Sequence, residues 1–301
     1  MKKILFLILI GLSTISCATK SEWKEPTSIN FLVLGDWGRN GEFNQKDVAK
    51  SMSIESTKQR DNFILSMGDN FYPDGVISTN DPNWKKSYED VYNFYSLNIP
   101  WYTVFGNHDY RGSIQAEIDY SKVSRRWRTN ERYYSFERTI PSSKEKVCFI
   151  FMDTNPFDKS LNRNTHSDLA QQDTIAQKKW LEETLSNSKA KWKIVMGHHP
   201  VYTSSTRHGE PFMTQFIPMF EKYGVDVYLA GHEHNLEHQQ KGSINYFISG
   251  SGSQLVPVSK SDAKFSKAEH GFMSVQLSKD VMNIQFINHR GKIIYKTNIT
   301  K

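Results

Sequence analysis

The sequence predicts an α/β fold in which two sheets pack face to face between outer layers of helices. Apolar runs typical of buried strands alternate with helical stretches over most of the chain, and after residue 243 the pattern changes to closely spaced short strands. In addition, polar blocks follow several of the strand-like runs, and open α/β sheets place their functional sites at such strand ends. We therefore expect a two-sheet α/β/β/α sandwich whose loops carry the site.

Apolar runs are expected to form the strands of the first three quarters of the chain. They are 29–34, 62–67, 100–105, 146–152, 192–197 and 225–230. Helices are expected between them at 44–60, 84–95, 114–126, 168–187 and 211–223. The closing part is expected to add strands at 244–249, 271–277 and 282–288, then a hairpin turn at 289–292 and a last strand at 293–297.

The composition fits a folded protein with a large core. The chain has 301 residues, of which 38% are hydrophobic, so it can form one large domain or two small ones. Its formal charge of +6 suits anionic substrates or surfaces, or simply a solvated basic face, because the basic residues are scattered. No arginine-rich arm or basic helix indicates dedicated nucleic-acid binding.

The N-terminus is typical of an exported protein. Lys2 and Lys3 precede the apolar stretch 4–12, which is too short to span a bilayer and fits the core of a signal peptide. The letters STISC, which end at Cys17, resemble a bacterial lipoprotein cleavage site, although Thr stands where Leu is usual. We expect residues 1–17 to be a signal peptide, with lipidation of Cys17 as a membrane anchor.

The rest of the chain is expected to contain a short polar tether at 18–28 and a folded domain at 29–301. If Cys17 carries lipid, only Cys148 remains, so no disulfide framework is expected. Cys148 lies within the apolar run 146–152, which favours a packing role over that of a reactive thiol.

Polar blocks with metal-binding side chains follow strand-like runs along the chain. They read GDWG, GDNFY, GNHD, GHHP and GHEHN. Their candidate metal ligands are Asp36, Asp69, Tyr72, Asn107, His198, His232 and His234. One such block alone is more often a turn or a solvated histidine, but the whole ordered set predicts a site for two adjacent hard or borderline cations.

The two Gly-Asp blocks suggest how the cations are held. Asp36 and Asp69 each follow a glycine directly, so the backbone can turn sharply and direct the carboxylate inward. One carboxylate must bridge two cations about 3.5 to 4 Å apart, and we assign that role to Asp69 because its block also supplies Tyr72. Taken alone, Tyr72 is equally consistent with core packing.

These motifs resemble the calcineurin-like metallophosphoesterases, and among them the small purple acid phosphatases of the tartrate-resistant type. Asp36 is followed by Trp37 and Gly38, without the histidine of a generic member of the superfamily, and GDNFY supplies Tyr72 instead. The similarity runs from about Phe31 to the C-terminus. It implies that residues 29–301 are one metallophosphoesterase domain with the two-sheet sandwich of that type.

The resemblance also implies a division of the ligands between two metal ions. An iron(III) ion would bind Asp36, Tyr72, His234 and the bridging Asp69. A second ion, which is iron(II), zinc or manganese in the family, would bind Asp69, Asn107, His198 and His232. A trivalent ion favours hard anionic oxygen, so the first set suits iron(III) better than the second.

The implied reaction is in-line attack of a metal-bound hydroxide on a phosphate monoester. His108 resembles the family's histidine that protonates the leaving group or orients the substrate, or it only supports the neighbouring Asn107. His208 is the other catalytic candidate, although it lies one residue further from GHHP than expected. His199 receives no role.

We therefore expect an exported, monomeric acid phosphatase in the bacterial envelope, as a periplasmic protein or an outer-membrane lipoprotein, or secreted. Its substrates are expected to be small phosphate esters or phosphoproteins. A phosphodiesterase or nucleotide pyrophosphatase on the same site, and a non-catalytic surface lipoprotein, are the alternatives. The loop 155–172 contains no cysteine, so the disulfide-restrained, cleavage-regulated loop of the mammalian enzymes is not expected.

Overall fold

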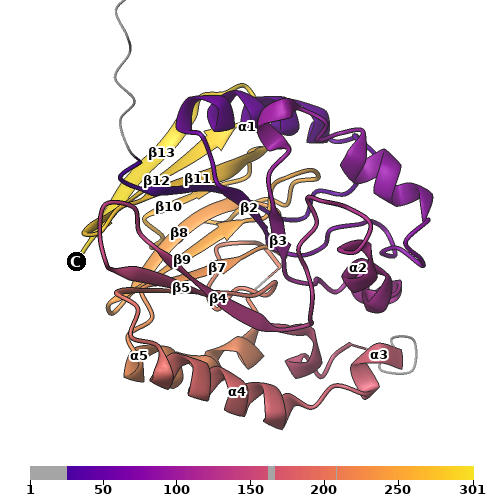
Figure 1. Cartoon of the computed structure of the whole chain (residues 1–301). Coiled ribbons are helices and arrows are strands. Elements are labelled where there is room, and N and C mark those ends of the chain that lie inside the picture. Colours follow the sequence, from indigo (N-terminus) through magenta and orange to yellow (C-terminus); the bar gives the residue numbers. More distant parts are fainter. Residues whose placement is uncertain (1–25, 162–166, 208) are drawn as a thin grey trace, which may run out of the picture.

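The computed structural model describes residues 26–161, 167–207 and 209–301. Two sheets lie between helices on their outer sides, which confirms the predicted sandwich (Figure 1). The predicted signal peptide, Cys17, most of the tether and His208 lie outside the described residues. Within the described part, no helix has the length and apolar character needed to cross a membrane.

The first sheet combines strands from both ends of the chain. Its order is β13 (Ile293–Thr300), β12 (Val281–Asn288), β11 (Gly271–Leu277), β1 (Ile29–Leu34), β2 (Phe63–Ser66) and β3 (Trp101–Thr103). The strands β1, β2 and β3 are parallel, whereas β11 pairs with β1 in the antiparallel direction. The carboxyl ends of β1, β2 and β3 therefore meet at one edge of the sheet.

The second sheet comes from the middle of the chain. Its order is β10 (Phe265–Lys267), β8 (Leu236–Lys241), β9 (Ile244–Ser249), β7 (Val227–Ala230), β6 (Trp192–Met196), β5 (Lys146–Phe151) and β4 (Tyr134–Thr139). The strands β5, β6, β7 and β9 are parallel. Four of these strands, β5, β6, β7 and β9, were predicted to within two residues, because each is a largely apolar run buried on both faces.

Alternation along the strands separates the layers of the core. In β1, Phe31 and Val33 belong to the inner core between the sheets, whereas Leu32 and Leu34 face the outer core under α1 (Gln45–Gln59). Side chains also alternate in β5 of the second sheet, where Phe149 faces the inner core and Cys148 faces the outer core under the helices of that side. Cys148 is a buried free thiol, as predicted, and burial raises its pKa.

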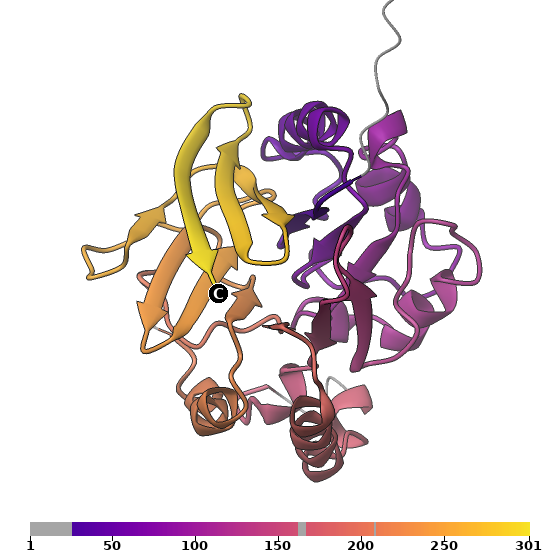
Figure 2. The ribbon, with the colours of Figure 1, turned by 60° about the vertical axis from the view of Figure 1, so that its left-hand side comes forward.

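Helices cover the two outer faces. Helix α1 lies over the first sheet, and α4 (Thr174–Asn187) and α5 (Ile217–Lys222) lie along the second (Figure 1). Figure 2, from another direction, again shows α1 at one end of the molecule and α4 and α5 at the opposite end, with the strands between them.

Several predicted helices are too long. The segment 84–95 forms a π-helix, η1 (Trp84–Glu89), and a separate 3-10 turn, η2 (Tyr95–Leu97). Helix α2 (Ile114–Tyr120) stops early because the chain must reach Trp127, which pairs with Trp101 at the edge of β3. These segments are rich in aromatic residues, whose packing overrides the helical pattern.

The other two helix predictions merge separate elements. The segment 168–187 splits into α3 (Ser167–Ala170) and α4, because Asp173 caps α4 by accepting hydrogen bonds from the backbone N–H groups of Ile175 and Ala176. The segment 211–223 begins as the 3-10 helix η5 (Pro211–Phe216) before α5 starts, with Pro218 in its first turn.

Candidate active site

The predicted ligands converge from both sheets. Asp36 follows β1, the block of Asp69 and Tyr72 follows β2, and Asn107 follows β3. From the second sheet, His198 follows β6, and His232 and His234 follow β7. Backbone hydrogen bonds join these strand ends: Asp36 N–H donates to the carbonyl of Gly68, and Gly231 N–H donates to that of His198. All seven side chains therefore lie in one place.

One group of donor atoms surrounds the Tyr72 hydroxyl. The hydroxyl oxygen lies 3.1 Å from Oδ1 of Asp36, 2.8 Å from Oδ2 of Asp69 and 3.0 Å from Nε2 of His234. The side chains of Asp36, Asp69, Tyr72 and His234 are all buried. We call this set the phenol cluster.

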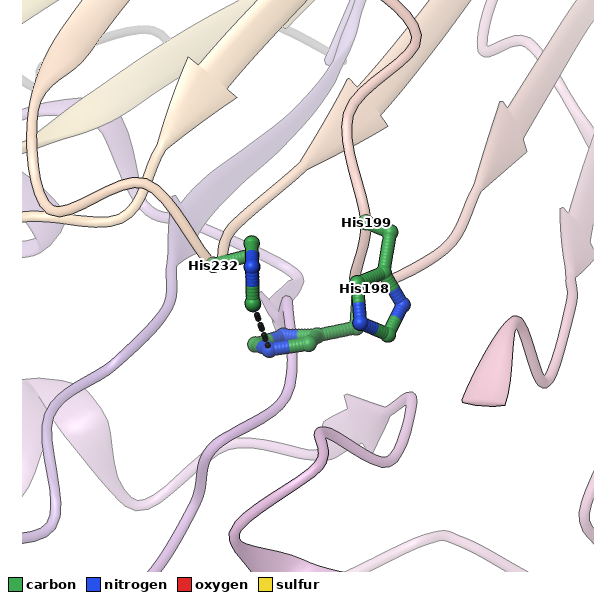
Figure 3. Close-up of side chains that lie close together, drawn as sticks. All are labelled: His198, His199 and His232. Carbon is green, nitrogen blue, oxygen red and sulfur yellow. Dashed lines mark hydrogen bonds between the residues drawn. The ribbon is translucent and has the colours of Figure 1, made fainter. Parts of the chain in front are cut away.

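The second group, the imidazole cluster, consists of Asn107, His198 and His232. Oδ1 of Asn107 lies 3.2 Å from Nε2 of His198 and 3.1 Å from Nδ1 of His232. Those two ring nitrogens are 3.2 Å apart, the contact drawn as a dashed line in Figure 3. Three polar atoms from three different loops thus face one common point.

The outer ring nitrogens decide what these facing atoms can bind. Nδ1 of His198 lies 2.8 Å from the carbonyl oxygen of Met67, so it must donate and carries the proton. Nε2 of His232 likewise faces a carboxylate oxygen of Glu210 at 3.1 Å. In the neutral form of both rings, the imidazole cluster presents three lone pairs to one point, and a cation is the group that satisfies them.

Asp69 connects the two clusters. Its Oδ2 belongs to the phenol cluster, while its Oδ1 lies 3.5 Å from Nε2 of His198 in the imidazole cluster. Oδ1 also accepts a hydrogen bond of 2.8 Å from the backbone N–H of His108, which fixes the carboxylate in this orientation. One carboxylate oxygen thus faces each cluster, as expected for a bridging ligand.

The donor sets fit metal ions. Ligand atoms that sit about 2.1 Å from a common cation at right angles are about 3 Å apart. The contacts within the clusters, from 2.8 Å for Tyr72 with Asp69 to 3.2 Å for the two histidines, match that separation. Oxygen atoms dominate the phenol cluster and neutral donors the imidazole cluster, so the two positions suit cations of different hardness.

The pKa shifts of the side chains in the two clusters also favour cation binding. Burial, and then the charge of Asp69, raise the pKa of Asp36 well above its usual range. Burial lowers the pKa of His198 to about 4 and that of His234 to about 3, so both rings are neutral ligands near neutral pH. Burial and the two carboxylates raise the pKa of Tyr72, so only a strong cation favours its phenolate.

The ligand residues themselves form the sharp turns that were expected at the glycines before them. Asp36, Asp69 and His232 themselves adopt left-handed φ values of 60°, 49° and 66°. Such conformations are unfavourable by about 1 to 3 kcal/mol each for residues other than glycine, and they are concentrated at functional sites. Of the glycines before the two aspartates, only Gly68 has a positive φ, of 87°.

The neighbouring glycines are needed for space. A Cβ atom on Gly106 would lie 2.1 Å from Oδ1 of Asp69, and one on Gly231 would lie 2.5 Å from Oδ2 of Asp36. Both distances are shorter than any real contact. The carboxylates therefore reach the centre only because these positions lack side chains.

Asp109 holds two of the motif loops together. Its carboxyl oxygens accept hydrogen bonds from the backbone N–H groups of Gly106, at 2.8 Å, and Phe71, at 3.1 Å. It is fully buried. Asp109, the last residue of GNHD, thus fixes the loop of Asn107 against the loop of Asp69 and Tyr72.

His108 lies at the edge of the site. Its ring centroid is 4.4 Å from that of Tyr72, and its Nε2 is 3.9 Å from Oδ2 of Asp69. Nδ1 lies 2.5 Å from the carbonyl oxygen of Pro73, which orients the ring. With its side chain 23% exposed, His108 has access to both solvent and centre. His208, the other catalytic candidate, is not among the described residues.

Two further residues near the centre had no predicted role. His199 is buried beside His232, with ring centroids 4.6 Å apart, and its Nδ1 lies 2.8 Å from the hydroxyl of Thr154 (Figure 3). Glu210, which contacts His232 as described above, was recognised only as part of RHGE. The sole sequence signal for either was its place in a block or loop already assigned to the site.

Comparison with known proteins agrees with this geometry. The calcineurin-like phosphoesterase family matches residues 29–236. The tartrate-resistant acid phosphatase type 5 of Rattus norvegicus is 30% identical over 98% of this chain and 98% of its own. Purple acid phosphatase 7 of Arabidopsis thaliana is 32% identical over 92% of this chain and 88% of its own.

A solved structure is similar over almost the same length. It is that of GAP50, described as the anchor in the inner membrane complex of Plasmodium, with a TM-score of 0.80, 27% identity and coverage of 91% of this chain and 89% of that chain. Together with the family match and the relatives, this similarity spans both sheets and every predicted ligand. The chain belongs to the calcineurin-like phosphoesterases, and its relatives at about 30% identity are purple and tartrate-resistant acid phosphatases.

Proposed function

We propose that the protein is an exported acid phosphatase that hydrolyses phosphate monoesters at a binuclear centre of iron(III) with iron(II), zinc or manganese. The observation that carries the proposal is the position of Asp69, whose two carboxylate oxygens face the phenol and imidazole clusters separately. The family membership and the acid phosphatase relatives support the same reaction.

The side chains divide the work between the clusters. Asp36, Tyr72 and His234 would hold iron(III), while Asn107, His198 and His232 would hold the second ion. When bound, the two ions would neutralise charge on the phosphoryl group and activate a water for attack in line with the leaving oxygen. Asp69 would keep both ions at the separation that this attack requires, because Asp109 and the His108 N–H fix its loop.

His108 is proposed to serve the leaving group. Its Nδ1 donates to the Pro73 carbonyl, so the ring keeps one orientation with Nε2 toward the centre. When that nitrogen carries a proton, it can donate it to the departing alkoxide oxygen. A histidine that only supported Asn107 would have no need for its partial exposure to solvent.

The site of action is proposed from the N-terminal sequence. Lys2, Lys3 and the apolar stretch after them support export, and Cys17 supports a lipid anchor in a bacterial envelope. Small phosphate esters or phosphoproteins that reach the cell exterior would then be the substrates, and the protein would act as a monomer.

One experiment tests the central proposal. The chain without residues 1–17 is purified, its metals are analysed, its visible spectrum is recorded, and hydrolysis of an aryl phosphate is measured at acid and neutral pH. Iron, a tyrosinate absorption band and acid-side activity are expected. Activity with colourless zinc or manganese would remove the iron assignment, and a bis-ester hydrolysed faster than the mono-ester would make the protein a phosphodiesterase.

The similarity to GAP50 gives a second candidate a specific basis, because that protein is described as an anchor. A well-folded chain that binds no metal and hydrolyses no ester would support such a non-catalytic role. The complete set of seven ligands argues against this role. In a protein that only anchors, three acceptor atoms that face one point without a donor would be unfavourable and would serve no purpose.

A further inference from the structure

Arg39 lies directly over a ligand of the phenol cluster. Its guanidinium carbon is 3.6 Å from the centroid of the Tyr72 ring and 5.6 Å from that of Phe43. Arg39 is half-buried, and Phe43 is 53% exposed, so the guanidinium lies where the phenol cluster meets solvent. Asn107, His108 and His232 are the other half-buried residues of the centre. We call these four, without Phe43, the mouth of the site.

The charge of Arg39 has no acidic partner among the residues that the structure describes. Its Nε is buried and has no hydrogen-bond partner among the described residues, and no described carboxylate forms an ion pair with its guanidinium. Other arginines do have such partners: Arg126 pairs with Glu89, and Arg132 pairs with Asp168 at 3.2 Å. A half-buried cation without an anion is unfavourable, so the arrangement is suited to an anion that arrives from outside.

The backbone around Arg39 is rigid. Its N–H donates to the carbonyl of Trp37, at 2.8 Å, and to Oε1 of Gln45, at 3.2 Å. The same Gln45 oxygen accepts from Gly41 N–H at 2.7 Å, and the Gln45 amide donates to the carbonyl of Ser87. Gln45 is fully buried. The loop therefore fixes the backbone from which the Arg39 side chain extends over the Tyr72 ring, which lowers the entropy that binding would cost.

The charge of Arg39 also acts on the centre. After burial, which is the main cause, it is among the groups that lower the pKa of His108 and His234. The guanidinium is therefore within electrostatic range of both the mouth and the phenol cluster. An anion bound in this centre would therefore be attracted by the charge of Arg39.

We propose that Arg39 is a substrate-binding residue, whose guanidinium donates hydrogen bonds to a non-bridging oxygen of the phosphate ester and, after hydrolysis, of the product phosphate. This inference rests on the proposed function and adds to it a contact that is independent of the metals. A guanidinium matches a phosphate with two parallel donors, and a hydrogen bond between charged groups is stronger than one between neutral groups.

The test measures phosphate binding as well as turnover. Calorimetric titration with inorganic phosphate and steady-state kinetics on an aryl phosphate are compared for the metal-loaded wild type, Arg39→Gln and Arg39→Lys. For Arg39→Gln, the Kd for phosphate and the KM are expected to rise about 10-fold or more, with kcat within about threefold. Arg39→Lys keeps a positive charge without the planar pair of donors. Its Kd for phosphate and its KM are expected to lie between those of the wild type and Arg39→Gln.

The matched control is Arg138→Gln. Arg138 is an exposed arginine on β4 that also lies near aromatic rings, 5.6 Å from the Phe136 centroid, but far from the centre. The Arg138→Gln variant should therefore have the same Kd for phosphate and the same KM as the wild type. If Arg39→Gln binds phosphate as the wild type does and changes only kcat or the visible spectrum, Arg39 acts on Tyr72 alone and the proposal is overturned. A wild type that neither binds phosphate nor hydrolyses esters would overturn the proposed function itself.

Discussion

The hydroxyl of Tyr72 lies 2.8 Å from Oδ2 of Asp69, and this contact joins a phenol to a carboxylate that also reaches the opposite cluster. A tyrosine in such a position is neither core packing nor a substrate contact, because its hydroxyl faces two carboxylates and an imidazole. The contact therefore supports the proposal that Tyr72 is one of the metal ligands.

Replacing the bridging carboxylate should remove the second metal and most of the activity. In Asp69→Asn, the carboxylate that faces both clusters becomes a neutral amide, so we expect metal content to fall from two ions to one or fewer per chain. Turnover of an aryl phosphate should fall at least about 100-fold. Asp119→Asn, at a partly exposed carboxylate on α2, is the control and should keep the wild-type metal content and turnover. Retention of both metals in Asp69→Asn would contradict the bridging role.

The colour of the protein should depend on one phenol. Burial and the neighbouring carboxylates keep Tyr72 protonated until a strong cation displaces the proton, so the visible band should appear on binding iron(III) and vanish with a chelator. Tyr72→Phe should abolish the band. Tyr88→Phe is the matched control, because Tyr88 is also buried and its hydroxyl has no described partner. A band that persists in Tyr72→Phe would disprove the assignment.

Glu210 should strengthen the binding of the second ion through His232. Its carboxylate orients the imidazole from behind at 3.1 Å, and loss of such a partner typically weakens metal affinity about 10- to 100-fold. We expect Glu210→Ala to show this loss in competition with a chelator of known affinity, and Glu210→Gln to show less of it. Glu131→Ala, on an exposed loop, should behave as wild type. Equal affinities across the series would rule out the role.

The stability of the fold should depend on pH through Asp61, which precedes β2, whereas the ligand Asp69 follows the other end of that strand. Burial, with a contribution from Glu55, raises its pKa from 3.8 to about 7. The folded state therefore holds the proton more tightly than the unfolded state, so ionisation destabilises the fold progressively between about pH 4 and pH 7. Below that window the penalty is absent, and above it the penalty is complete.

Asp61→Asn removes this titration. The variant should be more stable than wild type at pH 8, by up to about 4 kcal/mol, and the difference should shrink to near zero at pH 4. Urea unfolding at the two pH values measures it. A stability difference that is the same at both pH values would show that folding does not raise the pKa of Asp61.

The central strands were predictable because they are apolar on both faces. The strand β1 was predicted exactly, and β5 and β6 within one residue, since burial on both sides leaves a continuous apolar run. Three strands toward the sides of the second sheet were not: β4 reads YSFERT, β8 reads LEHQQK and β10 reads FSK. Their pairing is decided by neighbours distant in sequence, which local composition does not encode.

The ligands were predictable for a similar reason, because each lies beside a recognisable strand end in a fixed motif. The contacts that orient them were not. Glu210 reaches His232 only because the chain after β6 folds back over the loop after β7, and Arg39 covers Tyr72 only because Gln45 fixes its loop. No motif or residue spacing in the sequence indicates either contact.

The ligand sets have a mechanical consequence, because each draws on both sheets. The phenol cluster combines Asp36 from the first sheet with His234 from the second, and the imidazole cluster combines Asn107 with His198 in the same way. Each bound ion would therefore add a cross-link between two layers that also meet through the apolar inner core and through hydrogen bonds such as that of His198 Nδ1 to the Met67 carbonyl. Thermal inactivation would then begin when the sheets separate at this edge, before either sheet unravels, and the rate of metal release on heating would report directly on their docking.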